Sequence, residues 1–170
     1  RREHETVNRI DRRLGALVWD ADWGGEAGLG TQLRAHRSVL DVVNERSAGV
    51  PVNPEQRLDE HVLEAQLHGR ARSHDWTLGA EARNEGLADP GLPGGRSVAQ
   101  HRSLFVQDTF DLAGTLRLTW GLRHDRHDRH GDETSPRAYL VWRFDPAWTL
   151  KGGASHGFKA PNLKQIVPGA

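Results

Sequence analysis

The feature that most constrains this chain is a two-residue alternation of apolar and polar side chains near its C-terminal end. From Trp148 to Ala154 every second position is apolar or glycine, and the positions between them include Thr149, Lys151 and Gly153. Successive side chains of a β-strand point to opposite faces, whereas a helix distributes them around its circumference. The pattern therefore predicts a strand with one apolar and one polar face.

The same alternation recurs along the chain. It is present in residues 27–36, 76–83, 116–123 and 136–144, and in a shorter, less regular form in residues 17–22. Residues 103–110 are also strand-like, but aromatic side chains occur on both of their faces, so their sides cannot be assigned. The repeated pattern predicts an all-β fold of about eight antiparallel strands.

One segment, Leu58 to Arg72, is compatible with two structures. Its Leu, Glu, Gln, Ala and Arg residues favour a helix, in which Leu58, Val62 and Leu67 would share a face. The alternation of Leu63 and Leu67 with polar residues fits a strand equally well. Because hairpins flank this segment, we predict a strand.

The expected connections alternate in length. Short ones cover residues 23–26, 73–75, 111–115 and 145–147, and long polar ones cover residues 44–57, 86–100 and 126–134. Aromatic residues lie beside the short connections, namely Trp23, Trp76, Phe110, Phe144 and Trp148. One level of aromatic residues and unequal loops are typical of outer-membrane β-barrels. The alternative is a soluble β-sandwich with tryptophans in its core.

Composition narrows the classes of function. The formal net charge is zero, so no global basic field would attract nucleic acid. The mean hydropathy is −0.69 and no run of about 18 apolar residues exists, which excludes a transmembrane helix. A transmembrane strand is compatible with modest hydropathy, because only every second residue faces lipid.

Several ordered motifs closely resemble TonB-dependent outer-membrane receptors, in particular the branch of catecholate siderophore (ferric enterobactin) and colicin I receptors. The motifs are Gly121–Asp125, Ser135–Trp142, Leu150–Gly153 and Gly157–Leu163. Ser103–Asp108 resembles the strand that precedes them in that family, and Asp20–Gly24 resembles a more N-terminal hairpin. The resemblance is specific from about Ser103 to Pro168 and looser before that.

The resemblance implies an antiparallel transmembrane barrel of 22 strands, closed by a plug domain, in the outer membrane of a Gram-negative cell. Residues 1–170 would form part of the barrel domain, without the plug and the C-terminal strands. The transported ligand would be an Fe(III)-siderophore, and no covalently bound cofactor is expected. Implied partners are the TonB–ExbB–ExbD complex through the missing N-terminal region, outer-membrane lipid and lipopolysaccharide, and colicins or phages, but no nucleic acid.

Cationic residues are the candidates for ligand binding, because ferric catecholates are anionic and arginine also stacks on aromatic rings. Those expected at the extracellular end are Arg96, His101, Arg102, Arg126 and Arg129. The alternative is that these residues solubilise loops or pair with lipopolysaccharide phosphates. A second set should line the lumen and pair with the plug or with Glu81: Arg34, Arg70, Arg83, Arg123, Arg137 and Lys151.

Two further motifs could indicate a metal site or a haem ligand. His124, His127 and His130 are spaced three apart and would not converge on a strand, so we expect residues 124–133 to form a solvated extracellular loop without a metal site. Phe158–Leu163 resembles a box of haem receptors, but Lys159 replaces the arginine and no histidine follows. Haem uptake therefore stays an alternative, as does a passive porin or adhesin-like barrel.

No pattern predicts an enzyme. A phosphate-binding glycine loop, a nucleophile elbow and a His-Glu-x-x-His helix are all missing from the sequence. The glycine pair Gly152 and Gly153 removes the side chains from both faces of one strand. We expect this pair to allow bending of the strand or close approach of the plug.

Overall fold

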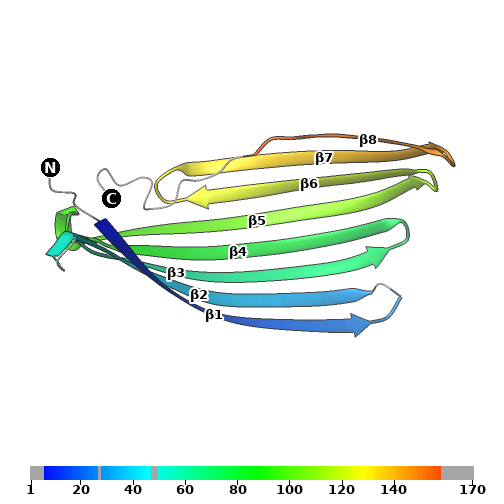
Figure 1. Ribbon diagram of the computed structural model, residues 1–170. Helices are drawn as coiled ribbons and strands as arrows, with labels where there is room; N and C mark the ends of the chain where they lie inside the picture. Colours follow the sequence, from blue (N-terminus) through cyan, green and yellow to red (C-terminus); the bar gives the residue numbers. More distant parts are fainter. Residues whose placement is uncertain (1–5, 27, 47–49, 158–170) are drawn as a thin grey trace.

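The computed structural model describes residues 6–26, 28–46 and 50–157, which form a single antiparallel sheet. Eight strands lie side by side in the order of the chain (Figure 1). They are β1 (Thr6–Gly24), β2 (Leu29–Arg46), β3 (Val50–Ala71), β4 (His74–Ala88), β5 (Arg96–Ala113), β6 (Leu116–His127), β7 (Gly131–Asp145) and β8 (Trp148–Ser155). A single turn of 3-10 helix, η1 (Pro93–Gly95), precedes β5. The predicted all-β, antiparallel fold is confirmed.

The strands are much longer than the sequence predicted. Most of the expected long loops continue the strands, so that β4 and β5 pair from His74↔Phe110 as far as Ala88↔Arg96. The connection between β6 and β7 shrinks to the three residues 128–130. The predicted loops over residues 86–100 and 126–134 were therefore wrong in extent, because polar residues on both faces hide a strand from a test of alternation.

Residues 58–71 form part of β3, which confirms the predicted strand. This segment pairs with β2 from Leu58↔Leu40 to His68↔Gly30, and with β4 from Leu58↔Leu87 to Ala71↔His74. The backbone groups of β3 thus find partners in both neighbours. Such a two-sided ladder outweighs helix propensities of a few tenths of a kcal/mol per residue.

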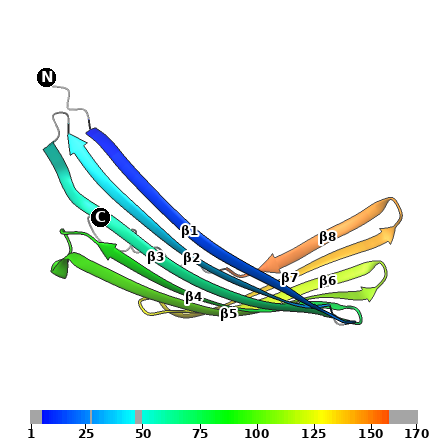
Figure 2. The same ribbon diagram turned by 90° about the horizontal axis from the view of Figure 1, so that it is seen from below.

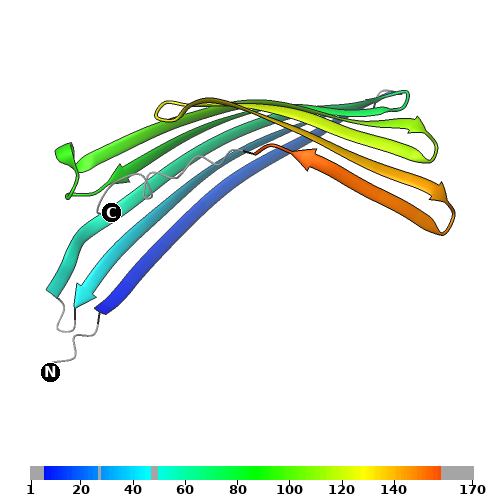
Figure 3. The same ribbon diagram turned by 90° about the horizontal axis from the view of Figure 1, so that it is seen from above.

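The sheet is a single curved layer and stays open. Seen along two other directions it bends into a trough, with β1 and β8 at the two edges (Figures 2 and 3). A β-sandwich needs a second sheet packed against the first, and the described residues form only one. The soluble sandwich is therefore excluded as a description of this part of the chain. Among the described residues, no helix has the length and hydropathy needed to cross a membrane.

One face of the sheet carries a continuous apolar band, and we call it the outer face. In each strand the band covers seven residues, of which every second one belongs to this face: 17–23, 29–35, 63–69, 76–82, 104–110, 116–122, 138–144 and 148–154. Large side chains of the band are exposed, for example Leu17 at 71% and Trp148 at 67%. Seven residues span roughly 20 Å along a strand, about the height of a membrane-facing barrel surface.

The upper limit of the band stays in one row from β1 to β4 and then moves in steps across β5 and β6. Leu63 pairs with Ala82, and both are the last residues of the band in their strands. In β5 the limit is Leu104, which pairs with Ala80, two residues below that level. It moves by two residues again in β6, because Leu122 pairs with Val106. Such a shift is expected when strands are tilted against the membrane plane.

Aromatic side chains gather at the short turns, as predicted. Trp142 and Phe144 contact each other with ring centroids 5.4 Å apart on β7. On β4 the ring of His74 stacks on Phe110 at 4.2 Å, and its Nδ1 atom lies 2.7 Å from Asp108. Phe110 and the tryptophans thus form one interfacial level, and the carboxylate of Asp108 beside them is paired with His74.

The opposite ends of β3, β4 and β5 close around a small apolar core on the other face, which we call the inner face. Leu87 and Ala99 are almost fully buried there, and Leu92 packs against them. Asp89 organises the connection, since its carboxylate accepts hydrogen bonds from the Gly91 amide and the Gln56 side chain, both at 2.8 Å. The connection between β4 and β5 is therefore a packed structure.

The outer face should tolerate charge far less than the inner face. Replacing Leu78, in the middle of the band, with arginine would place a charge against lipid and cost about 2–4 kcal/mol. Its neighbour Thr77 points to the inner face, so Thr77→Arg is the matched control. The measurement is urea unfolding of the reconstituted gene product that contains this chain. Equal losses for the two variants would show that the faces are assigned wrongly.

Candidate functional site

The inner face carries a connected cluster of charged and aromatic side chains on β4, β5 and β6, at and above the upper end of the apolar band. Register places Glu81, Ser103 and Asp125 in one row, because Glu81 pairs with Ser103 and Ser103 with Asp125. Ser103 is 4% exposed and Asp125 is 9% exposed. Polar groups this buried require partners, and the cluster supplies them.

Arg123 is the centre of the cluster. Its Nε atom donates to both Asp125 oxygens at 2.9 and 3.2 Å, and its Nη2 atom donates to Ser103 Oγ at 2.7 Å. The same Nη2 atom lies 3.5 Å from Glu81 Oε2. One guanidinium thus contacts two carboxylates, from β6 and from β4 on the far side of β5, as its planar set of donors permits.

Glu81 also binds Arg83, and His101 joins the two carboxylates. Arg83 Nη2 lies 3.2 Å from Glu81 Oε1. His101 Nε2 is 2.9 Å from Asp125, and His101 Nδ1 is 3.9 Å from Glu81. The sequence predicted that lumen-facing cations pair with Glu81, and the structure confirms this for Arg83 and Arg123.

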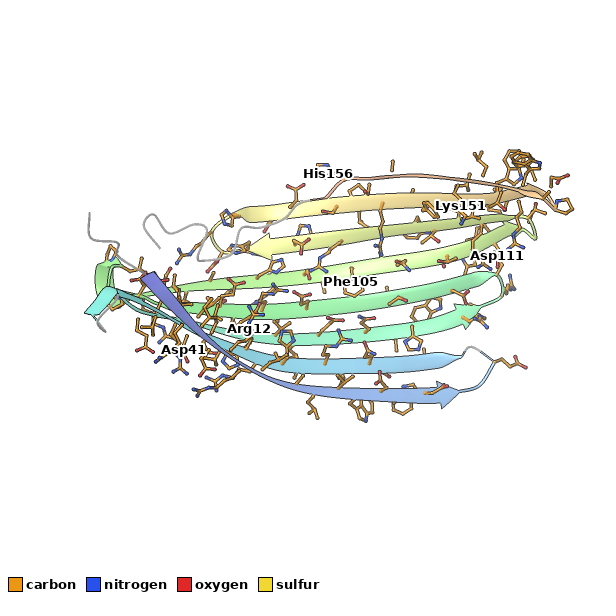
Figure 4. The ribbon with its side chains drawn as sticks, in the orientation of Figure 1. Arg12, Asp41, Phe105, Asp111, Lys151 and His156 are labelled. Atoms are coloured by element: carbon orange, nitrogen blue, oxygen red, sulfur yellow. The ribbon has the colours of Figure 1, made fainter. Side chains whose placement is uncertain are left out.

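Phe105 lies on the inner face beneath Arg123, near the middle of the sheet (Figure 4). The guanidinium carbon is 5.9 Å from the centre of the ring. The ring occupies the space above Gly79, where an added Cβ would lie 2.1 Å from the ring edge. Gly79 is thus required for the packing of Phe105, which explains why residues 103–110 have aromatic side chains on both faces.

Three histidines follow at the end of this cluster. The rings of His101 and His127 are 6.0 Å apart, and those of His127 and His130 are 4.6 Å apart. The expectation that the histidines do not converge was wrong for this pair, because the 128–130 turn reverses the chain between them. His124 points to the outer face instead. No group of three metal-ligating side chains arranged to hold a metal ion occurs within residues 6–26, 28–46 and 50–157.

The environment of His127 favours the neutral form of its imidazole. Burial away from water lowers its pKa below the ordinary 6.5, and the neighbouring His130 and His101 lower it further against the opposing effect of Asp128. The Arg129 amide donates to His127 Nδ1 at 3.1 Å, which requires an unprotonated Nδ1. The 3.3 Å approach of Asp128 to the same atom is therefore not an ion pair.

The five predicted ligand residues lie on different surfaces. His101 belongs to the inner cluster, whereas Arg96, Arg102 and Arg126 alternate to the outer face above the apolar band. Arg129 lies in the β6–β7 turn and donates to Ser97 Oγ at 2.7 Å and to the Val98 carbonyl at 2.8 Å. The structure therefore does not bring the five together, and their contact with a ligand stays a prediction.

Sequence reasoning missed the buried part of this site. Residues 124–133 were predicted as a solvated loop, but Asp125 and His127 are buried in β6 and residues 131–133 begin β7. Ser103 and Phe105 were not singled out either. The signal that could have found them is the alternation of His101, Ser103 and Phe105 on one side of a strand that pairs with Arg123 and Asp125.

The remaining predicted lumen cations share the inner face. Arg34, Arg70, Arg137 and Lys151 all occupy inner-face positions of the register. Gly153 is covered by Tyr139, since an added Cβ would lie 2.8 Å from that ring, whereas the space at Gly152 is open. The motif Phe158–Leu163 lies outside the described residues.

Comparison with known protein families decides the classification. The family model for the TonB dependent receptor-like β-barrel matches residues 2–170. The chain belongs to the TonB-dependent receptors. The members of this family are receptors and transporters of the Gram-negative outer membrane, so the outer membrane is also where this chain belongs.

Curated relatives in the family are iron-uptake proteins by name. The "Iron-regulated outer membrane virulence protein" of Vibrio cholerae is 32% identical over 168 residues, which is 96% of this chain and 24% of that protein. The "Ferric enterobactin receptor" of Pseudomonas aeruginosa is 42% identical over 88 residues, or 49% of this chain and 12% of that protein. The chain thus spans a quarter or less of the length of these relatives.

Solved structures of TonB-dependent receptors share the fold. The ferric enterobactin receptor PfeA of P. aeruginosa matches 95% of this chain and 27% of its own, with 26% identity and a TM-score of 0.77. The siderophore receptor PirA of the same species matches 92% of this chain and 30% of its own, with 28% identity and a TM-score of 0.76. The open sheet of eight strands therefore corresponds to a segment of a TonB-dependent barrel wall.

Removing Arg123 should destabilise the barrel more than removing an exposed arginine. Arg123→Gln leaves Asp125 and Glu81 without their shared cation in a half-buried site, so we expect a loss of about 1–2 kcal/mol. Arg117, which pairs with Asp111 at 2.7 Å near a short turn, is more exposed, and Arg117→Gln should cost less than Arg123→Gln. Denaturant unfolding of both variants checks this ranking, and the reverse order would contradict the central place of Arg123.

Acidification should destabilise the region around His127. Because the pKa of His127 is lower in the folded state, the unfolded chain binds a proton first as the pH falls below 6.5. The stability contributed by neutral His127 is thus complete above that pH and is lost as the pH falls toward the lower folded value. The loss should be smaller in His127→Gln than in the parent. Unfolding curves between pH 7.5 and 5 measure it, and an identical pH dependence would refute it.

Proposed function

We propose that this chain forms part of the barrel wall of an outer-membrane receptor that takes up a ferric siderophore with energy from the TonB complex. The observation that carries the proposal is the match of the whole barrel segment to a family whose relatives are named as ferric enterobactin receptors. A solved PfeA structure that contains enterobactin shares the fold, with 26% identity and a TM-score of 0.78.

The inner cluster fits the wall of a ligand path. Its cations are held in fixed positions by Glu81 and Asp125, so an anionic chelate would meet oriented guanidinium and imidazole groups. Phe105 and the histidine rings offer flat surfaces on which a catechol ring could stack. We propose that His101 and Arg129 contact the ligand or the plug from this side.

Arg96, Arg102 and Arg126 fit a second task better. All three lie on the outer face. Arg102 and Arg126 are just above the apolar band, where the phosphates of lipopolysaccharide would be in reach, and Arg96 lies further out along β5. Arg102 and Arg126 are directly opposite each other, and like charges in this position repel. Asp132, 3.8 Å from Arg126, offsets part of this repulsion, and a further anion at Arg102 would offset the rest. We propose lipid phosphate as that anion, and TonB–ExbB–ExbD as a partner of regions outside this chain.

Uptake of radioactive iron tests the function directly. The gene product that contains this chain is expressed in a strain without its own catecholate receptors and supplied with ferric enterobactin, a neutral ferric hydroxamate or haem. We expect accumulation of iron from the anionic ferric catecholate, and none in an otherwise identical strain without TonB. Arg129→Gln should reduce this uptake several-fold.

Two outcomes would contradict the proposal. Uptake that continues unchanged without TonB would indicate a passive barrel. Accumulation from haem alone would move the ligand to another class of chelate. Expression in the outer membrane is verified for each variant, so that loss of transport is not confused with loss of protein.

A further inference from the structure

A groove crosses the outer face of β1–β4 at the level where the apolar band ends. It has a volume of about 540 Å³ and is lined by residues of all four strands. Its floor is made of small residues, because Gly15, Ala35 and Ala82 all occupy outer-face positions. An added Cβ at Gly15 would meet no atom within 4 Å, so the groove is open there.

The groove has an apolar lower half. Register places Leu17, Ala35, Leu63 and Ala82 in one row across the four strands. The two leucines project outward, since Leu17 is 71% and Leu63 is 58% exposed, and the two alanines leave depressions beside them. Leucine side chains that project beside alanine depressions on a membrane-facing surface fit an extended acyl chain.

The upper half is polar, and its cations lie nearest to the apolar row. The next row outward contains Gly15, Arg37, His61 and Asn84. The carboxylate of Asp59 lies one row further out, and Asp11 and Asp41 lie beyond it. A second hollow of about 390 Å³ continues outward from Gly15 and Arg37 between Arg13 and Arg57.

Arg37 keeps donors for a further ligand. Its Nε and Nη2 atoms bind the two oxygens of Asp59 at 3.1 and 2.5 Å, so the Nη1 donors are not engaged by this carboxylate. The pair holds the Arg37 side chain in place, and His61 Nε2 lies 3.1 Å from the same Asp59. A guanidinium and an imidazole, both oriented by Asp59, thus stand directly above an apolar groove.

We propose that this groove binds one phosphorylated lipid of the outer leaflet, with an acyl chain in the apolar half and a phosphate on Arg37 and His61. The apolar row and the cationic row follow each other in the same order as the acyl chain and the phosphate of a lipid, because the phosphate is the first charged group beyond the acyl chains. The inference rests on the proposed place of the outer face in the membrane. It assigns a site to the lipid, away from the inner cluster.

Filling the groove is the sharpest test. Gly15→Leu places a side chain on the floor without removing a charge, and its matched control is Gly152→Leu, an open glycine on the outer face of β8. Arg37→Gln removes the phosphate contact. Its control is Arg70→Gln, which disrupts a similar pair with Asp75, at 2.6 Å, on the inner face.

The purified, delipidated gene product is titrated in neutral detergent with lipid A bisphosphate and with phosphatidylethanolamine, and native mass spectrometry counts the bound lipid. We expect one lipid A per barrel, with affinity at least tenfold weaker in Gly15→Leu and Arg37→Gln and unchanged in both controls. Phosphatidylethanolamine should bind more weakly than lipid A.

Unchanged lipid A binding in Gly15→Leu and Arg37→Gln would overturn the proposal. It would also be overturned if the parent protein and Arg37→Gln each bound lipid A and phosphatidylethanolamine with equal affinity. If Gly15→Leu does not fold, Ala35→Leu fills the same groove and takes its place. Iron uptake is measured in parallel. The groove and the proposed ligand path lie on opposite faces, so the two proposals can fail separately. Loss of lipid binding with normal uptake would refute only the lipid site. Absence of uptake with normal lipid binding would refute only the uptake function.

Discussion

The structure depends on one constraint, which is that every backbone amide and carbonyl at membrane depth must find a partner within the protein. An unpaired peptide group in hydrocarbon costs several kcal/mol, and the sheet avoids this by pairing each strand with its neighbours over long, nearly unbroken registers. Within residues 6–26, 28–46 and 50–157, only β1 and β8 have an unpaired edge. A sheet of this kind is stable in lipid only as part of a closed barrel, and the family to which the chain belongs provides one.

Because the backbone is fixed in this way, the side chains of the sheet form one apolar face and one charged face. The outer face presents leucines, tryptophans and alanines over seven residues in each strand, and its polar residues begin in steps that follow the tilt of the strands. The inner face collects arginines and carboxylates that neutralise each other, with Arg123 as the shared cation of Asp125 and Glu81. The face assigned to the membrane and the face proposed to contact the ligand are thus separated by a single peptide layer.

Much of this division could be predicted from the sequence, and the features that could not be predicted have identifiable physical reasons. The alternation around Trp120, Leu140 and Trp148 predicted the strands and their faces, because lipid contact demands apolar side chains at every second position. Beyond the band polar residues occur on both faces and apolar ones such as Leu87 and Ala99 are isolated, so the continuation of β4 and β5 toward η1 shows no regular alternation. The contact of His127 with His130 depends on a tight turn, and the place of Phe105 depends on Gly79 in another strand.

If the faces are assigned correctly, neighbouring residues of one strand face lipid and water in turn, and β6 allows this to be measured directly. The 170 residues contain no cysteine, so single cysteines placed at positions 117 to 122 can be compared on an unmodified background. A water-soluble maleimide applied to permeabilised cells should label the replacements of Arg117, Thr119 and Gly121, and a lipid-dissolved quencher should reach probes only at Leu118, Trp120 and Leu122. Labelling without this two-residue period, or with the opposite phase, would contradict the assignment of the faces and the account built on it.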